Sequence, residues 1–196
     1  MKAIIFDFDG VIHNTFEFHR TRVKNFTGIE LNPEEYRNMH KKNMYLNIPK
    51  AFESVSWSEY SKFIHEDMAN LKTRNKTKEA IRDLAKKHNL YIITSGTKKN
   101  ISAYLERNKI LDNFKDILGV ETHKMKIEKF KYLFKKYKTK ESECVFVTDT
   151  LGDICEANEV GVKTIAVDFG FHSREVLNEG NPFRIISRFE EIKNLV

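Results

Sequence analysis

Hydrophobic residues gather into five short, nearly uninterrupted runs along the chain. They are AIIFDF near residue 5, LYIIT near 92, a weaker DILGV near 118, CVFVT near 146 and KTIAVDF near 166. Apolar runs of this length, without polar alternation, are typical of strands buried on both faces, as in a parallel sheet. The pattern therefore predicts five buried strands.

The segments between these runs have helical rather than extended spacing. Apolar stripes occupy Ala80, Ile81, Leu84 and Ala85 in 78–88, and Ile127, Phe130, Leu133, Phe134 and Tyr137 in 127–137. Strands that alternate with helices form right-handed β-α-β units. The predicted fold class is α/β, with a doubly wound (Rossmann-like) parallel sheet at its core.

Residues 14–75 interrupt this alternation, because they contain helix signals and no convincing strand. The signals are a shared face of Phe16, His19, Val23 and Phe26, the pair Asn32-Pro33 as N-cap and first helical residue, and a capping box at 56–59. We expect a small all-helical cap subdomain at 14–75. It is inserted into a core made of 1–13 and 76–196.

Length and composition exclude several classes of protein. With 196 residues, 40% of them hydrophobic, the chain has enough apolar material for one core with an insertion. No apolar run approaches the ~20 residues of a membrane span, and the first apolar run is too short for a signal peptide. Cys144 and Cys155 have neither CxxC nor metal-ligand spacing, which predicts reduced thiols and a cytoplasmic location. The sequence indicates no oligomeric state.

Positive charge is unevenly distributed. Net charge is +6, and residues 124–140 hold eight lysines and one glutamate. The simpler interpretation is a solvated helix face, and the alternative is attraction to an anionic substrate or to nucleic acid. No aromatic–basic RNA motif or helix-turn-helix supports nucleic acid, which stays the weaker alternative.

Two acids stand at the end of the first predicted strand. Asp7 and Asp9 are two residues apart, so in an extended segment their side chains point the same way, and Gly10 permits a sharp exit. Like charges repel unless a cation lies between them, and hard carboxylate oxygens suit Mg²⁺. An ordinary acidic turn is the alternative for this motif taken alone.

Two other strand ends carry polar groups. Thr94, Ser95 and Gly96 follow the second strand and precede a helix, an arrangement that can bind an anion or simply cap the helix. Asp149 ends the fourth strand, and Asp153 follows in the turn. In an open parallel sheet these ends lie along one edge.

A lysine completes the set. Lys126 directly precedes the apolar stripe of 127–137, where its charge opposes the helix dipole, which suggests another partner. Lys124 is the alternative at this position. We favour Lys126 for its place at the helix start.

The order of these residues resembles the four motifs of the haloacid dehalogenase superfamily, in the sequence Asp7-x-Asp9-Gly10-Val11, Thr94, Lys126 and Asp149-x-x-x-Asp153. The resemblance covers essentially the whole chain. The stretch DFDGVIHNTFEFH is similar to the phosphoglycolate phosphatase and β-phosphoglucomutase branch, whose helical cap is of the C1 type. The lysine motif lacks the expected Lys-Pro pair, and the tail resembles the family's closing strand, helix, strand and helix.

The resemblance implies catalytic roles for four of these residues. Asp7 would attack phosphorus and form an aspartyl-phosphate, and Asp9 would protonate the leaving alcohol and then activate water. Thr94 and Lys126 would balance charge on the phosphoryl oxygens.

It also implies ligand sites. Mg²⁺ would be held by Asp7, the backbone carbonyl of Asp9 and Asp149, with Asp153 binding through water or orienting Lys126. The expected substrate-binding residues are Gly10, Ser95, Gly96 and His19. A histidine on an apolar helix face is more often a packed core residue, so His19 has two interpretations.

The function implied is a Mg²⁺-dependent phosphomonoester hydrolase acting on a small phosphorylated metabolite. Alternatives are a sugar phosphomutase of the β-phosphoglucomutase type and a catalytically silent regulator that binds Mg²⁺ or phosphate. The same enzyme class acting on a nucleic-acid end is a weaker possibility.

Overall fold

A parallel six-stranded sheet, in the order β3-β2-β1-β4-β5-β6, forms the centre of the computed structural model, which describes residues 2–43, 45 and 48–196. All neighbouring strands pair in parallel. The strands are β1 (Ala3–Phe6), β2 (Asn89–Ile93), β3 (Phe114–Leu118), β4 (Cys144–Thr148), β5 (Lys163–Val167) and β6 (Arg184–Ile186). The five strands predicted from apolar runs are confirmed.

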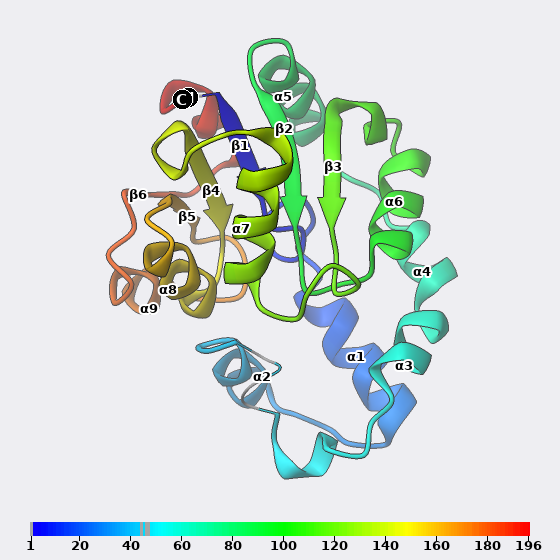
Figure 1. Cartoon of the computed structure of the whole chain (residues 1–196). Coiled ribbons are helices and arrows are strands. Elements are labelled where there is room, and N and C mark those ends of the chain that lie inside the picture. The colour runs from blue at the N-terminus through cyan, green and yellow to red at the C-terminus, as the bar shows by residue number, and fades with distance from the viewer. Residues whose placement is uncertain (1, 44, 46–47) are drawn as a thin grey trace.

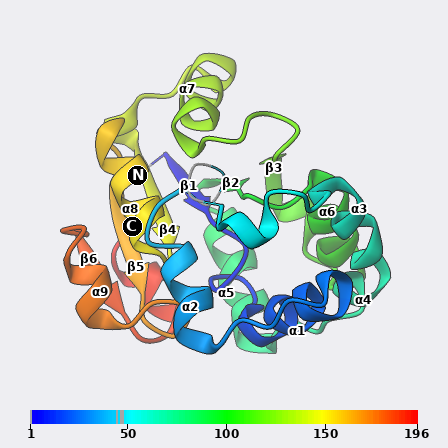
Figure 2. The ribbon, with the colours of Figure 1, turned by 90° about the horizontal axis from the view of Figure 1, so that it is seen from below.

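Helices cover both faces of the sheet. Helices α5 (Asn75–Ala85) and α6 (Lys98–Arg107) pack on the face that carries Ile4 and Phe6 of β1. On the opposite face, α7 (Lys126–Tyr137) and α8 (Leu151–Glu159) pack over Ile5. Figure 2 shows α5 and α7 on opposite sides of the strands. Alternate side chains of β1 thus enter two cores, as a strand buried on both faces requires.

Short elements complete the described chain. Helix α9 (Arg174–Asn178) leads to β6, and the 3-10 helices are η1 (Lys50–Phe52), η2 (Leu111–Asn113), η3 (Glu141–Glu143) and η4 (Phe189–Asn194). The doubly wound α/β fold is confirmed. The closing strand β6 has only three residues, too few for an apolar pattern to reveal it.

Between β1 and α5, the described part of the chain consists of helices joined by turns and loops, with no strand. It contains α1 (Phe16–Thr27), α2 (Pro33–Met39), η1, α3 (Trp57–Phe63) and α4 (His65–Ala69). Asn32 caps α2 by accepting from the backbone N–H of Glu34 and Glu35, and Ser56 caps α3. Residues 44 and 46–47 of the expected cap lie outside the described residues.

This helical segment faces the carboxyl ends of the strands (Figure 1). Hydrogen bonds dock its α2 end onto the core. Arg37 Nε donates to the Phe171 carbonyl at 2.9 Å, His172 Nε2 lies 2.9 Å from the Arg37 carbonyl, and Gly152 N donates to the His40 carbonyl at 3.3 Å. The strand ends and the helical segment therefore enclose a common space. No helix of the described chain is long and apolar enough to cross a membrane.

Candidate active site

Asp7 occupies the first position after β1, at the carboxyl end of the strand, which faces the helical segment. Its backbone N–H still donates to the Val147 carbonyl of β4, which fixes the residue to the sheet. Oδ1 accepts a 2.7 Å hydrogen bond from the Phe8 backbone N–H. Only 6% of Asp7 is exposed. The carboxylate is held in one orientation before anything binds.

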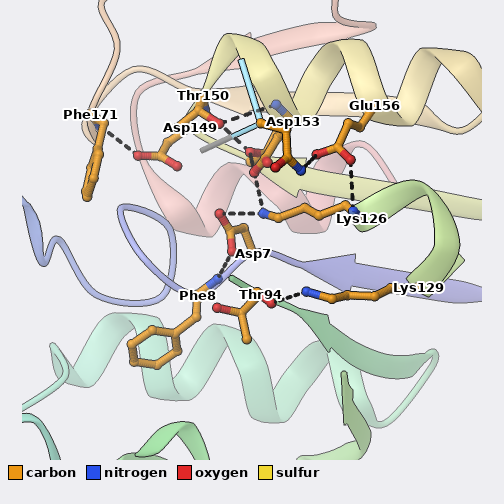
Figure 3. A network of polar contacts seen from close by, with 12 residues as sticks. Asp7, Phe8, Thr94, Lys126, Lys129, Asp149, Thr150, Asp153, Glu156 and Phe171 are labelled. Carbon is orange, nitrogen blue, oxygen red and sulfur yellow. Dashed lines mark hydrogen bonds and ion pairs between the residues drawn. The ribbon is translucent and has the colours of Figure 1, made fainter. Parts of the chain in front are cut away.

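Lys126 connects Asp7, after β1, with Asp153, in the first turn of α8. Its Nζ lies 2.9 Å from Asp7 Oδ2 and 2.5 Å from Asp153 Oδ2, and the lysine is only 2% exposed (Figure 3). Lys124 is exposed, with its ammonium 5.8 Å from the centre of the Tyr45 ring. Of the two lysines, Lys126 is therefore the one whose ammonium meets the carboxylates.

Burial and charge set the ionisation of this cluster. Burial raises the pKa of Asp7 well above its usual value, against the opposing attraction of Lys126. Burial also disfavours ionised Asp153, but the Lys126 ammonium and hydrogen bonds, including one from the Thr148 hydroxyl at 2.6 Å, outweigh it and lower the pKa of Asp153. Burial disfavours the charged form of Lys126, but the carboxylates of Asp153 and Asp7 outweigh it and raise the pKa of Lys126, which keeps it cationic. Asp153 is thus the firm counter-ion of Lys126.

Asp149 follows β4, and one of its oxygens has no partner. Oδ2 accepts from the Phe171 backbone N–H at 2.7 Å, whereas the buried Oδ1 has no hydrogen bond. Burial raises the pKa of Asp149 to about 8. A buried carboxylate oxygen without a donor is costly unless a cation or proton satisfies it.

Gly10 leaves room for this carboxylate. Its φ is +74°, and a Cβ built there would lie 1.7 Å from Asp149 Oδ2. Any other residue would therefore meet both left-handed backbone strain and a direct clash. Gly10 is buried and is absent from the lining of the adjacent cavity, so its position supports Asp149 rather than contact with a substrate.

Two of the three buried aspartate carboxylates at this site are available to bind a small hard cation. Among residues 2–43, 45 and 48–196, no three acidic, histidine or cysteine side chains form a complete metal cluster. Asp7 and Asp149 offer two carboxylates, and Asp153 is already engaged by Lys126 and Thr148. Mg²⁺ commonly binds one or two carboxylates and keeps several waters. The orphaned Asp149 Oδ1 and the two carboxylates suit that mode of binding.

Asp9 borders the cavity, and one of its carboxylate oxygens, Oδ1, is engaged by neighbouring side chains. Oδ1 accepts from the Thr15 hydroxyl at 2.6 Å and lies 3.0 Å from His19 Nε2. Desolvation raises the pKa of Asp9, but the charge and hydrogen bond of His19, helped by Thr15, outweigh it and lower that pKa. His19 Nδ1 in turn lies 2.9 Å from the Tyr60 hydroxyl.

His19 therefore differs from a packed core histidine. It lies on α1 with one ring nitrogen at an acid and the other at a hydroxyl, and it lines the cavity. Its neighbours on this helix face, Phe16 and Val23, are buried, and Val23 also lines the cavity. Contact with Asp9 is the most direct relationship that the geometry gives it.

The end of β2 supplies a tight turn. The Thr94 hydroxyl is buried and accepts from the Gly96 backbone N–H at 3.0 Å. Ser95 and Gly96 line the cavity, and Thr97, which follows them, is the residue that caps α6. The expected helix-cap function thus belongs to Thr97, leaving the turn at 94–96 exposed to the cavity on its Ser95 and Gly96 side.

A cavity of about 750 Å³ connects these groups with the helical segment. Asp7, Asp9, Lys126, Asp149 and Asp153 line its floor. The opposite walls come from α1, α2, α3 and α4 and the residues beside them. This volume is within the ~300–1,000 Å³ range of small-molecule sites.

Two buried charged residues of the site escaped the sequence analysis. Glu156, on α8, accepts from the Lys126 backbone N–H at 2.9 Å and from Asn43 Nδ2 at 3.0 Å, and burial raises its pKa. The glutamate therefore caps the N-terminus of α7. Met125, at the capping position of α7, has no side chain that can do so, and that missing cap was the available signal.

Lys129 is the second, and it corrects the interpretation of 124–140 as a solvated face. Its side chain is completely buried, with Nζ donating to the Thr94 carbonyl at 2.6 Å. Burial and the neighbouring Lys126 lower the pKa of Lys129 to about 8. The i, i+3 spacing from Lys126 to Lys129 and the adjacent buried Phe130 place both lysines on the inner face of α7. The remaining lysines of this segment are exposed.

Comparison with known proteins adds a family to this geometry. The model of the haloacid dehalogenase-like hydrolases matches residues 4–167. A curated phosphoglycolate phosphatase of Vibrio parahaemolyticus serotype O3:K6 (strain RIMD 2210633) is 25% identical over 108 residues, which are 54% of this chain. The match spans about half, 47%, of that relative's length.

Solved structures share the whole architecture. A hydrolase of the haloacid dehalogenase-like family from Streptococcus pneumoniae superposes with a TM-score of 0.82 at 17% identity, over 100% of this chain and 98% of that one. A predicted phosphoglycolate phosphatase from Haemophilus somnus 129pt superposes with a TM-score of 0.76 at 18% identity, over 99% of this chain and 97% of that one. These likenesses establish a common fold.

Proposed function

The chain belongs to the haloacid dehalogenase-like hydrolases, and we propose that it is a phosphatase that hydrolyses small phosphomonoesters with the help of Mg²⁺, through a phosphoryl group carried on Asp7. One observation carries the proposal. The Lys126 ammonium lies 2.9 Å from Asp7 in a buried site, beside an Asp149 carboxylate with an unsatisfied oxygen. Fixed positive charge beside a carboxylate at a cavity floor is what phosphoryl transfer requires.

Asp7 is the nucleophile in this proposal. Its carboxylate is fixed by the Phe8 backbone N–H and borders the cavity. Because burial raises the pKa of Asp7, the ionised form depends on positive charge nearby, which Lys126 supplies. Attack on phosphorus forms an Asp7–phosphoryl bond and breaks the bond to the alcohol oxygen.

Asp9 is the general acid and then the general base in this proposal. Protonated Asp9 donates to the departing alcohol oxygen, and the resulting carboxylate then takes a proton from the water that attacks the phosphoryl group on Asp7. His19 and Thr15 position its Oδ1. The second oxygen of Asp9 is then the one available for proton transfer.

Lys126 and Asp153 act together. Asp153 accepts a hydrogen bond from the Thr148 hydroxyl and holds the ammonium in place. The ammonium balances charge that develops on the phosphoryl oxygens. Thr94 and the turn at 95–96 would complete the oxyanion environment. Lys129 holds the Thr94 carbonyl from beneath and so helps to fix that turn.

Asp7, Asp149 and the backbone carbonyl of Asp9 would hold Mg²⁺, which when bound supplies positive charge to the phosphoryl oxygens. Asp153 would remain with Lys126. The helical segment 14–75 would act as a cap over the core of 1–13 and 76–196, limiting access of water and selecting the ester.

Phosphate release from a panel of small phosphomonoesters, with and without Mg²⁺, tests the proposal. We expect Mg²⁺-dependent turnover that is lost in Asp7→Asn. Asp168→Asn is a matched control, because Asp168 also follows a strand but lies outside the cavity, paired with Arg174 at 3.0 Å. A folded chain that binds Mg²⁺ and releases phosphate from no ester would overturn the proposal.

A further inference from the structure

The wall of the cavity next to Asp9 is aromatic and apolar. Resting on the proposed function, we infer that the preferred substrates are phosphomonoesters whose alcohol carries an uncharged aromatic ring, bound against Trp57 and Tyr60. The inference concerns the leaving group, and it separates this chain from an enzyme for small charged acids such as phosphoglycolate.

The position of the wall relative to Asp9 identifies what it would contact. The Tyr60 hydroxyl lies 2.9 Å from His19 Nδ1, and His19 Nε2 lies 3.0 Å from Asp9 Oδ1. Tyr60 therefore stands one side chain away from the proposed proton donor. Because Asp9 and Tyr60 line the same cavity, the alcohol that Asp9 protonates would lie within reach of this wall.

Trp57 continues the wall as a rigid surface. Its ring packs edge-to-face on Tyr60 with centroids 5.7 Å apart, and it stacks against Phe52 at 6.1 Å. Phe52 is buried, whereas Trp57 remains partly exposed and lines the cavity. A large ring fixed by two neighbours presents a surface for another ring at little entropic cost.

Aliphatic side chains surround the two rings. The cavity is lined on this side by Val23, Ile48, Ile64 and Met68. Ile64 and Met68 are buried in the core that Tyr60 also joins. At about 750 Å³ the cavity is of the size that takes drug-like ligands, far larger than a two-carbon phosphate ester needs.

The cavity's cations do not favour a carboxylate on the alcohol. Lys126 is engaged by two carboxylates, and Lys62 is exposed and paired with Glu59 at 2.8 Å. Lys99 and Lys124 are exposed at the cavity wall. Among the lining residues that the structure describes, none is a buried lysine or arginine left to pair with an added carboxylate. Such a group would lose hydration against an apolar wall without compensation.

A matched panel of alkyl phosphates tests the inference. Benzyl phosphate, cyclohexylmethyl phosphate, ethyl phosphate and phosphoglycolate all release alkoxide-type leaving groups, so chemical reactivity differs little among them. We expect the kcat/KM for benzyl phosphate to exceed that for ethyl phosphate and phosphoglycolate by about tenfold or more, and to exceed that for the cyclohexylmethyl ester.

Variants assign the preference to the wall. Trp57→Ala is expected to lower the benzyl-to-ethyl ratio of kcat/KM by about tenfold, and Trp57→Phe to retain most of it. Phe183→Ala removes an exposed aromatic ring that lies outside the cavity and should leave the ratio unchanged.

Different results would contradict the proposed phosphatase and the proposed aromatic preference. Release of phosphate from none of the esters would contradict the proposed phosphatase itself. Turnover with phosphoglycolate or ethyl phosphate at least as good as with benzyl phosphate would overturn only the aromatic preference. So would a cyclohexylmethyl ester equal to the benzyl ester, or a ratio unchanged by Trp57→Ala.

Discussion

His19 Nε2 lies 3.0 Å from Asp9 Oδ1, which joins the first helix after β1 to the acid proposed to transfer the proton. The opposite nitrogen of the ring lies 2.9 Å from the Tyr60 hydroxyl. A single histidine thus connects the proposed proton donor with the aromatic wall. Its position makes it a positioning residue for Asp9 as well as part of the cavity lining.

Replacing His19 by Gln should raise the pKa of Asp9, because the histidine charge and hydrogen bond are what lower it. In a pH profile of kcat/KM, the inflection that belongs to Asp9 should move to higher pH. In an Asp9→Asn background the same exchange should not move any inflection. A changed KM with an unmoved profile would instead indicate that His19 only contacts substrate.

Replacing each of the two candidate lysines in turn should distinguish their roles. Lys126→Met leaves buried Asp7 and Asp153 without their counter-ion, so we expect kcat to fall about 100- to 1,000-fold and the free energy of unfolding to fall by about 3–5 kcal/mol at pH 7. Lys124→Met, at an exposed position, should change the free energy of unfolding by less than about 0.5 kcal/mol. Urea unfolding and steady-state kinetics measure both, and equal losses in the two variants would contradict the assignment.

Gly10 and Gly28 provide a matched pair of left-handed glycines. Their φ values are +74° and +75°, but only a Cβ at Gly10 would strike the Asp149 carboxylate, while nothing lies within 4 Å of one at Gly28. Both Ala variants should lose about 1–2 kcal/mol of stability through backbone strain. Only Gly10→Ala should weaken Mg²⁺ binding in a calorimetric titration. Equal Mg²⁺ affinity in the two variants would exclude a metal site at Asp149.

Buried Lys129 should make stability depend on pH in the alkaline range. Its pKa is lowered to about 8, whereas the ordinary value is 10.5, so between these values the unfolded chain binds more protons than the folded one. The cost of burying the charged form is full below about pH 8 and disappears above about 10.5. Relative to Lys129→Met, the wild type should gain about 1–3 kcal/mol in free energy of unfolding as pH rises from 7 to 10. Parallel stability curves for the two proteins would contradict a lowered pKa.

Much of the fold was accessible from sequence because its strands are buried on both faces. Apolar runs such as the one around Ile5 have no solvent-facing positions, so they stand out from the amphipathic helices. Asn32 and Ser56 were recognisable as helix caps because capping depends on local chemistry. The three-residue β6 carries no such signal of its own.

Long-range contacts of charged side chains were less accessible. Lys129 belongs to a lysine-rich segment, and only the packing of α7 on the sheet shows that this lysine points inward, toward the end of β2. Glu156 caps a helix that lies 30 positions away in the chain. Neither partner can be inferred from local spacing, because each contact depends on how two helices meet.

Acid quenching of an Asp9→Asn chain mixed with p-nitrophenyl phosphate and Mg²⁺ tests the central claim most directly. This ester needs no proton donor for its leaving group, whereas release of phosphate from Asp7 would lack its base. Intact-mass spectrometry should then show one added phosphoryl group, and peptide mapping should place it on the peptide that contains Asp7. The added mass should be absent when Asp7 is also changed to Asn. Turnover of the ester with no adduct, or an adduct on another residue, would contradict a phosphoryl group carried on Asp7.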